Sequence, residues 1–261
     1  MGTLKICRVS IYDCLIFAPM PTTLCLDFGN TRLKVAVFDN EALQEIIFLR
    51  EDAFSHLEEI LTLYQPQASI LSSVIHHDPA IEEVLVAKTH FHKLSDKSRL
   101  PFTIPVGKPE TMGADRIAAA AAAVSLFPAQ NILAITLGTC ITYNFIDSQH
   151  QFLGGSISPG MAMRFRSMHD YTAKLPLVQG HWNVPLIGYD TATNLQSGVV
   201  WGMVTEIEGI IELYKSRYGN FNALLTGGDL PNILPHVKKE IFADPELIFK
   251  GLYAIRTVNS A

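Results

Sequence analysis

The sequence predicts an α/β protein built from two duplicated halves with a cleft between them. Two stretches carry this prediction, residues 24–38 and 135–147, because each reads as a strand, a short glycine-containing turn and a second strand. Alignment of Leu26-Asp27-Phe28-Gly29 with Ile135-Thr136-Leu137-Gly138 gives both stretches the same plan, and the second turn is one residue tighter. A unit that occurs once in each half is the pattern expected of a duplicated domain.

The first turn offers groups that suit phosphate oxygens. Its backbone N–H groups, the Thr31 hydroxyl and the Lys34 ammonium are donors, and the Asp27 carboxylate can hold a cation through water. Gly29 and Asn30 both tolerate the positive φ of a tight hairpin. Taken alone, this stretch is better explained by an ordinary hairpin with an exposed Asp, because Gly-Asn turns are common. The second copy favours two turns that grip a polyphosphate from both sides.

Composition narrows the possible functions. The chain has 261 residues, of which 48% are hydrophobic and 17% charged, so one large or two small domains with a substantial core are expected. The net charge of −5, without a Lys/Arg run, argues against general nucleic-acid binding. No apolar run reaches the 18 or so residues of a membrane span, so no membrane association is expected. The cysteines form no CxxC pair and are predicted to be reduced thiols of a cytoplasmic protein. They are Cys7, Cys14, Cys25 and Cys140.

The start of the first repeat sets the expected N-terminus. Asp13 interrupts the short apolar stretch of residues 1–20 and no cleavage site follows, which argues against a signal peptide. Because the first strand begins only at about Thr23, residues 1–20 are expected to be a non-native or disordered extension, with translation starting at Met20. The predicted domains are residues 21–128 and residues 129–261.

Periodicity and capping signals predict the remaining elements. A helix is expected to begin at the capping box Ser55-x-x-Glu58, and another to begin with Gly113-Ala114-Asp115-Arg116 and to end before Pro128. Strands are expected over residues 42–49, 68–74, 91–94, 152–160 and 223–226, and further helices over 79–88, 161–171, 191–214 and 247–258.

Two kinds of site are disfavoured. The pairs His76/His77 and His90/His92 lack Cys or carboxylate partners at ligand spacing, so solvated histidines are expected there rather than a metal site. Neither GxxxxGK[ST] nor GxGxxG occurs, which disfavours a P-loop or Rossmann enzyme.

Six motifs, in this order, make the chain resemble the type III pantothenate kinases of the actin-like ATPase and sugar kinase superfamily. They are Asp27-Phe28-Gly29-Asn30-Thr31-x-x-Lys34, Gly113-Ala114-Asp115-Arg116, Gly138-Thr139-x-x-Thr142, Gly154-Gly155-x-Ile157-x-Pro159-Gly160, Thr172-Ala173-x-Leu175-Pro176 and Thr226-Gly227-Gly228. The resemblance implies two RNase H-like halves and the ATP-dependent phosphorylation of pantothenate, the first step of coenzyme A synthesis. It also implies a homodimer, Mg²⁺ with ATP, and a monovalent cation, K⁺ or NH₄⁺.

The resemblance also implies a role for individual residues. Asp115 is the general base that accepts the proton of the pantothenate hydroxyl, although the residue pattern alone is also explained by a charge-matched helix start. Pantothenate is bound by Gly113, Ala114, Asp115, Arg116 and, from the partner subunit, Thr191. The implied ATP-binding residues are Asp27, Phe28, Gly29, Asn30, Thr31, Arg32, Leu33, Lys34 and Thr139.

Three positions depart from the family pattern. Thr136 stands where the family usually has the Asp that binds the monovalent cation, Asn144 stands at another usual Asp, and Val106 at a usual Tyr. A hydroxyl can ligate K⁺, but more weakly than a carboxylate. A non-catalytic paralogue with a ligand-binding or regulatory role is therefore the alternative to an active kinase. A different kinase or phosphatase of the superfamily is disfavoured, because the substrate loop would have to differ wholesale.

Overall fold

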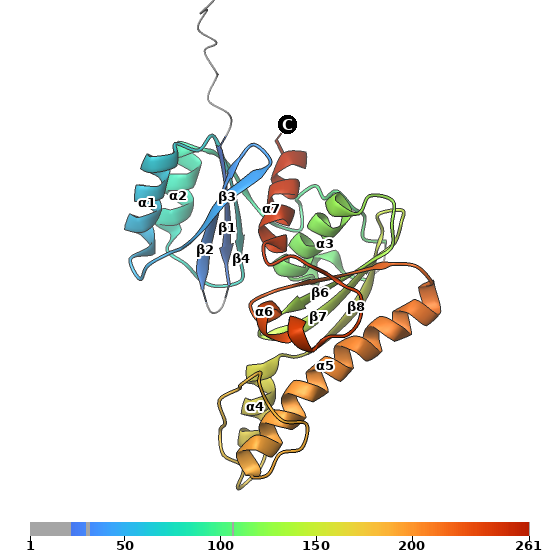
Figure 1. Cartoon of the computed structure of the whole chain (residues 1–261). Helices are drawn as coiled ribbons and strands as arrows, with labels where there is room; N and C mark the ends of the chain where they lie inside the picture. Colours follow the sequence, from blue (N-terminus) through green and yellow to red (C-terminus); the bar gives the residue numbers. More distant parts are fainter. Residues whose placement is uncertain (1–21, 30–31, 106, 261) are drawn as a thin grey trace, which may run out of the picture.

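The strands of the protein form two five-stranded sheets (Figure 1). The computed structural model describes residues 22–29, 32–105 and 107–260, so the predicted extension 1–20 lies outside the described residues. The first sheet contains β1 (Thr22–Phe28), β2 (Leu33–Asp39), β3 (Ala42–Phe48), β4 (Ala68–Ser73) and β5 (His90–Lys93). The second contains β6 (Ile132–Leu137), β7 (Cys140–Ile146), β8 (Phe152–Pro159), β9 (Asn222–Thr226) and β10 (Phe242–Ala243).

The two sheets have the same topology. The first has the order β3-β2-β1-β4-β5 and the second, read in the matching direction, β8-β7-β6-β9-β10. In each sheet the first three strands in sequence pair antiparallel, and the other two are added in parallel. The connection between the last paired residues is Gly29 to Arg32 in the first hairpin and Gly138 to Cys140 in the second. The second turn is one residue tighter, so the predicted duplication is confirmed down to the strand register.

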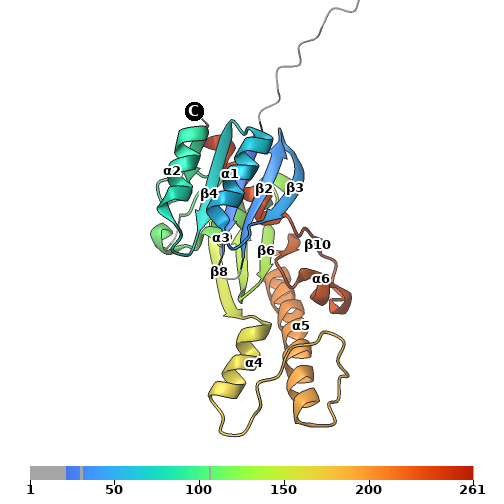
Figure 2. The ribbon, with the colours of Figure 1, turned by 90° about the vertical axis from the view of Figure 1, so that its left-hand side faces the viewer.

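The helices divide the core into three layers. Helices α1 (Ala53–Tyr64) and α2 (Pro79–Lys88) cover the outer face of the first sheet (Figure 2). Helices α3 (Ala114–Leu126) and α7 (Leu247–Val258) lie between the two sheets (Figure 1). On the outer face of the second sheet lie α4 (Met161–Asp170) and α5 (Thr191–Tyr218), and the one-turn helix α6 (Leu230–Ile233) follows β9.

The alternation of the strands decides which residues enter the central layer. Leu24, Leu26 and Phe28 of β1 pack under α1 and α2, whereas Cys25 packs in the cluster that contains α3 and α7. Because successive side chains of a strand point to opposite faces, Asp27 shares the inner face with Cys25. The predicted site residue Asp27 therefore faces the layer that holds α3.

The α3–α7 contact depends on small residues. The alanine run 118–123 of α3 is buried, and a Cβ atom on Gly251 of α7 would lie 1.8 Å from the Ala118 carbonyl oxygen. The two helices therefore approach backbone to backbone. This confirms that the alanine run serves packing, and the contact joins α7 to the helix whose first turn contains Asp115.

Helix α4, the N-terminal part of α5 and the irregular segment 171–190 between them extend beyond the second sheet as an arm (Figure 1), while the rest of α5 packs on that sheet. A polar cluster joins the arm to the second sheet. Glu206 of α5 accepts hydrogen bonds from the Tyr143 hydroxyl (2.9 Å) and the Ser158 hydroxyl (2.5 Å), and it pairs with Arg164 of α4. Burial and the adjacent Glu206 carboxylate raise the pKa of Tyr143, so its hydroxyl remains the donor.

Three local predictions were wrong. Helix α1 begins at Ala53 after the N-cap Asp52, so Ser55 lies within the first turn and does not cap it. His77 is not solvated, because its side chain is 9% exposed and contacts Ser73 Oγ and Glu82 Oε1 at 3.0 and 2.9 Å. Helix α5 continues to Tyr218 rather than ending near residue 214. No helix within the described ranges is both long and apolar enough to cross a membrane.

Candidate functional site

A polar row crosses the first sheet at the end of β1. Asp27 is paired with Lys34 of β2 on one side and with Ser72 of β4 on the other. Directly opposed residues of neighbouring strands point to the same face, so all three side chains enter the central layer. Lys34 Nζ also lies 5.7 Å from the centre of the Phe48 ring, and the Arg32 guanidinium lies 5.3 Å from it. The row thus places one carboxylate between an ammonium and a hydroxyl.

Burial disfavours the charged form of the Asp27 side chain. Desolvation raises its pKa to about 6, the Lys34 charge opposes this rise, and the Asp115 carboxylate adds to it. The last effect shows that Asp115 of α3 lies within electrostatic reach of Asp27. A cation bound here would relieve the repulsion between the two carboxylates, so the pair fits a metal-bound phosphate group.

Replacing Asp27 should therefore stabilise the protein without ligand. A carboxyl group whose pKa is about 6 when folded and ~3.8 when unfolded contributes stability below pH 4 that is lost as the pH rises through 6. Asp27→Asn should raise the free energy of unfolding at pH 7.5 by up to about 3 kcal/mol and change it little at pH 4. Urea titrations at both pH values measure this difference, with Asp39→Asn at the exposed end of β2 as the control. A difference that is the same at both pH values would contradict the pKa argument.

The first turn of α3 carries the candidate base. Gly113 is the N-cap, and its carbonyl oxygen accepts hydrogen bonds from the backbone N–H groups of Arg116 and Ile117 at 3.1 Å. A Cβ atom on Gly113 would lie 2.6 Å from Asp115 Oδ1, so the carboxylate folds over the glycine. The helix dipole favours a carboxylate at this position by roughly 0.3–1 kcal/mol. Gly113 therefore leaves space for the Asp115 carboxylate.

Arg116 links α3 to the second sheet. Its Nε–H donates to Asn144 Oδ1 of β7 at 2.6 Å, and its guanidinium lies 5.6 Å from the centre of the Phe152 ring of β8. Burial lowers the pKa of Arg116, while Asp115 and Tyr214 oppose that shift. Neither Phe152 nor Tyr214 was among the predicted site residues. In the sequence, Asn144 is only a departure from the family pattern, but its position two residues after Thr142 places both side chains on one face of the strand.

The second turn is held between two glycines. A Cβ atom on Gly160 would lie 2.1 Å from the Gly138 carbonyl oxygen, and one on Gly227 would lie 2.1 Å from the Leu137 carbonyl oxygen. The Gly160 N–H also donates to the Thr139 carbonyl oxygen at 3.0 Å. These close approaches explain why the glycine motifs accompany the hairpin, and they leave the Thr139 side chain exposed.

A row of hydroxyls on the second sheet corresponds to the first polar row. Thr136 of β6 is paired with Thr142 of β7 and with Thr226 of β9. Within the described part of the chain, the buried Oγ1 atoms of Thr136 and Thr226 have no hydrogen-bond partner. An unsatisfied buried hydroxyl costs roughly 1–3 kcal/mol, so two on neighbouring strands suit a bound polar ligand or ion.

Not every predicted residue is placed in this region. Asn30 and Thr31 of the first turn, and Val106, lie outside the described residues. Ala114 is the first residue of α3, and Leu33 pairs with Phe28 beside the first turn. Thr191 is the first residue of α5, and the N-terminal end of this helix belongs to the arm (Figure 1).

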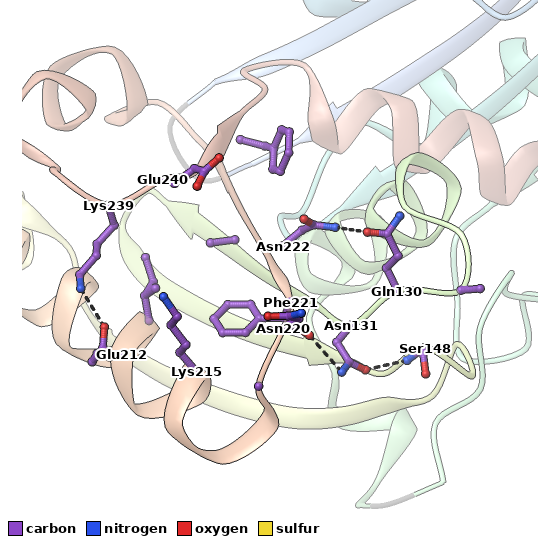
Figure 3. A pocket seen from close by; sticks show the side chains of 15 residues that line it. Gln130, Asn131, Ser148, Glu212, Lys215, Asn220, Phe221, Asn222, Lys239 and Glu240 are labelled. Atoms are coloured by element: carbon purple, nitrogen blue, oxygen red, sulfur yellow. Dashed lines mark hydrogen bonds and ion pairs between the residues drawn. The ribbon is translucent and has the colours of Figure 1, made fainter.

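A cavity of about 590 Å³ lies elsewhere, at the opposite end of the second sheet (Figure 3). Its polar groups are largely paired with one another: Asn222 Nδ2 donates to Gln130 Oε1 at 2.6 Å, and Lys239 Nζ lies 2.8 Å from Glu212 Oε2. No predicted site residue lines this cavity. Its size therefore does not mark it as the reaction site.

The family model for type III pantothenate kinases matches residues 23–213. A type III pantothenate kinase of Christiangramia forsetii is 39% identical over 90% of this chain and 98% of its own length. One of Bacteroides fragilis is 37% identical over 91% of this chain and 98% of its own length.

Solved structures share the fold at low sequence identity. A Campylobacter jejuni protein assigned to the Baf family of transcriptional activators has a TM-score of 0.56 and 20% identity, over 91% of this chain and 98% of its own. The activator of 2-hydroxyisocaproyl-CoA dehydratase from Clostridium difficile, with bound ADPNP, has a TM-score of 0.50 and 14% identity, over 92% and 96%. These likenesses confirm the predicted class of two duplicated α/β halves.

Proposed function

The chain belongs to the type III pantothenate kinase family, and we propose that it transfers a phosphoryl group from ATP to pantothenate with Asp115 as the general base. The product would be 4'-phosphopantothenate, formed in the first step of coenzyme A synthesis. The observation that best supports the proposal is the position of Asp115, which lies in the first turn of α3 beside Arg116 and within electrostatic reach of Asp27. The acceptor, the base and the phosphate-binding turn would then share the central layer.

In this mechanism, Asp115 accepts the proton of the pantothenate hydroxyl as that oxygen attacks the γ-phosphorus atom, and the bond from this phosphorus to the β–γ bridging oxygen breaks to release ADP. A carboxylate is a weak base, but phosphoryl transfer has a loose transition state in which alignment of the nucleophile matters most. Arg116 would hold the pantothenate carboxylate through charge-assisted hydrogen bonds. Gly113 and Ala114 would line the same end of α3.

Lys34 and the backbone of the first turn would bind the ATP phosphates, and Thr139 would approach them from the second turn. The inferred phosphate-binding residues of the first turn are Asp27, Phe28, Gly29, Asn30, Thr31, Arg32, Leu33 and Lys34. Asp27 would hold Mg²⁺, consistent with its desolvated carboxylate beside a second acidic group. Mg²⁺, when bound, neutralises charge on the transferring phosphates.

The monovalent cation, K⁺ or NH₄⁺, would be held by neutral oxygens. The unpartnered Thr136 and Thr226 hydroxyls have the right donor type, because K⁺ accepts neutral oxygen ligands. These hydroxyls lack the charge of a carboxylate, so the affinity of the proposed site for the cation is expected to be low.

Thr136→Asp should therefore increase the response of the kinase to K⁺, because it adds a full negative charge next to the Thr226 hydroxyl. The measurement is turnover as a function of K⁺ concentration. The isosteric control Thr136→Val removes the unpartnered hydroxyl, so the K⁺ response should fall while stability is kept. An unchanged K⁺ response in both variants would show that position 136 does not contact a cation.

The active site would be completed by a second subunit. Thr191 stands on the projecting arm, where Leu186, Ile187 and Tyr189 are 73%, 82% and 81% exposed. Such large exposed apolar side chains are typical of interfaces, which supports a homodimer in which Thr191 reaches the site of the partner subunit. We also place the enzyme in the cytoplasm, since Cys25 and Cys140 are free thiols.

The decisive experiment is a coupled ADP-release assay with pantothenate, ATP and Mg²⁺, with and without K⁺ or NH₄⁺. Pantothenate-dependent ADP release is expected. A folded protein that binds pantothenate but releases no ADP would favour the non-catalytic paralogue, which neither the site nor the comparisons support.

A further inference from the structure

Glu206 of α5 is the central acceptor of the polar cluster on the outer face of the second sheet. Its Oε1 atom accepts hydrogen bonds from the Tyr143 hydroxyl at 2.9 Å and the Ser158 hydroxyl at 2.5 Å, and its Oε2 atom accepts one from Arg164. Burial acts to raise the pKa of Glu206, but the three hydrogen bonds and the Arg164 charge outweigh it and lower the pKa. One charged carboxylate therefore joins β7, β8, α4 and α5.

Arg164 connects this carboxylate to the end of β8. Its Nε–H donates to the Pro159 carbonyl oxygen at 2.8 Å, and its Nη2 group donates to Ser158 Oγ at 3.3 Å. Its backbone N–H donates to the carbonyl oxygen of Gly160, the N-cap of α4, at 3.0 Å. All three residues of the segment 158–160 are thus held by the cluster.

The segment 158–160 lies directly against the second turn. The Gly160 N–H donates to the Thr139 carbonyl oxygen at 3.0 Å, and a Cβ atom on Gly160 would lie only 2.1 Å from the Gly138 carbonyl oxygen. The Thr139 side chain is exposed and forms no hydrogen bond with any described residue. The position of its hydroxyl therefore depends on the backbone of the turn and on the Gly160 backbone packed against it.

We propose that Glu206 is a positioning residue that holds the second turn where Thr139 can meet the ATP phosphates. The path of contacts runs from the Glu206 carboxylate through Arg164 and the segment 158–160 to the Thr139 backbone. This inference rests on the proposed function, because it takes the phosphates to lie against the second turn. A hydroxyl that binds a phosphate oxygen must be held to within about 0.5 Å, so weaker support of the turn should weaken ATP binding.

The test is Glu206→Gln, which keeps the size of the side chain but removes the charge that pairs with Arg164. The Kd and the KM of ATP should rise by about five- to tenfold, while the KM of pantothenate changes by less than about twofold. The variant should stay folded, because Met203 and Ile207 keep α5 packed on the sheet. A purely structural role would lower the melting temperature without changing the ratio of the two KM values.

The matched control is Glu212→Gln, which makes the same change on the same helix. Glu212 pairs with Lys239 at 2.8 Å, but this ion pair is exposed and lies at the end of the sheet opposite the second turn. An exposed pair of this kind contributes little, so the control should keep the wild-type KM of ATP.

Two further variants keep the test decisive. Tyr143→Phe removes only one hydrogen bond from the Glu206 carboxylate, so it should raise the Kd of ATP by about two- to threefold even if Glu206→Gln fails to fold. In a Thr139→Ala background, Glu206→Gln should weaken ATP binding no further, because the positioned hydroxyl is gone. An unchanged Kd in the Glu206 and Tyr143 variants, equal losses for ATP and pantothenate, or an undiminished effect without the Thr139 hydroxyl would overturn the proposal.

Calorimetric binding of ATP with Mg²⁺, in the absence of pantothenate, separates this inference from the proposed function. A wild-type protein that binds ATP but releases no ADP with pantothenate would refute the kinase activity, while the dissociation constants of the variants would still test Glu206. A wild-type protein that does not bind ATP would refute both, since no phosphate would then meet the second turn.

Discussion

Asp115→Asn should lower kcat by a factor of roughly 10²–10⁴, the usual contribution of a positioned general base. The amide keeps the size of the side chain over Gly113 but cannot accept the proton of the attacking hydroxyl. Since the proposed contacts of Arg116 with pantothenate would remain, the KM of pantothenate should change much less than kcat. Steady-state kinetics with pantothenate and ATP measure both parameters.

The matched control is Asp78→Asn. Asp78 also stands at a helix start, where its Oδ1 atom accepts the Ala80 N–H of α2, and Asn can accept the same bond. This variant should retain wild-type kinetics. The melting temperature of Asp115→Asn should stay within a few degrees of wild type, because a helix-start carboxylate contributes only about 0.3–1 kcal/mol. A nearly unchanged kcat would remove Asp115 from the role of base.

Gly251→Ala should destabilise the protein by about 2–3 kcal/mol. The added methyl group would lie 1.8 Å from the Ala118 carbonyl oxygen, and relief requires α7 to move away from α3 because the clash is with backbone. The intrinsic helix preference of Ala over Gly, about 1 kcal/mol, is too small to offset this cost. Denaturant unfolding measures the loss, and turnover should fall too, because α3 positions Asp115 and Arg116.

Gly209→Ala is the corresponding control in α5. No atom lies within 4 Å of the Cβ that this substitution would add, so the helix should gain up to about 1 kcal/mol. Opposite signs for the two glycines would confirm that close packing, and not helix propensity, decides the effect at residue 251. Equal stability of wild type and Gly251→Ala would show that the two helices can separate without cost.

The hairpins, the repeat and the start of α3 could be predicted because their signals are local. Runs of apolar residues define β1 and β6, and the register of each hairpin follows from its turn. The helix start at Ala114 and the alanine run that follows need only the sequence around them. The predicted helix start at Ser55 was wrong for the same reason. Asp and Ser are both favoured N-cap residues, so the local sequence does not decide whether the helix begins after Asp52 or after Ser55.

The contacts that assemble the candidate site join distant parts of the chain, so no local pattern contains them. Arg116 meets Asn144 and Phe152, Gly251 meets Ala118, and Gly160 and Gly227 close on the second turn only when the sheets and helices pack. Family resemblance supplied the expected roles of Asp115 and Arg116, which the residue pattern left open. Burial, which only the tertiary structure decides, determines which charged groups lose their hydration. It raises the pKa of Asp27 and lowers the pKa of Arg116, because in both side chains it disfavours the charged form.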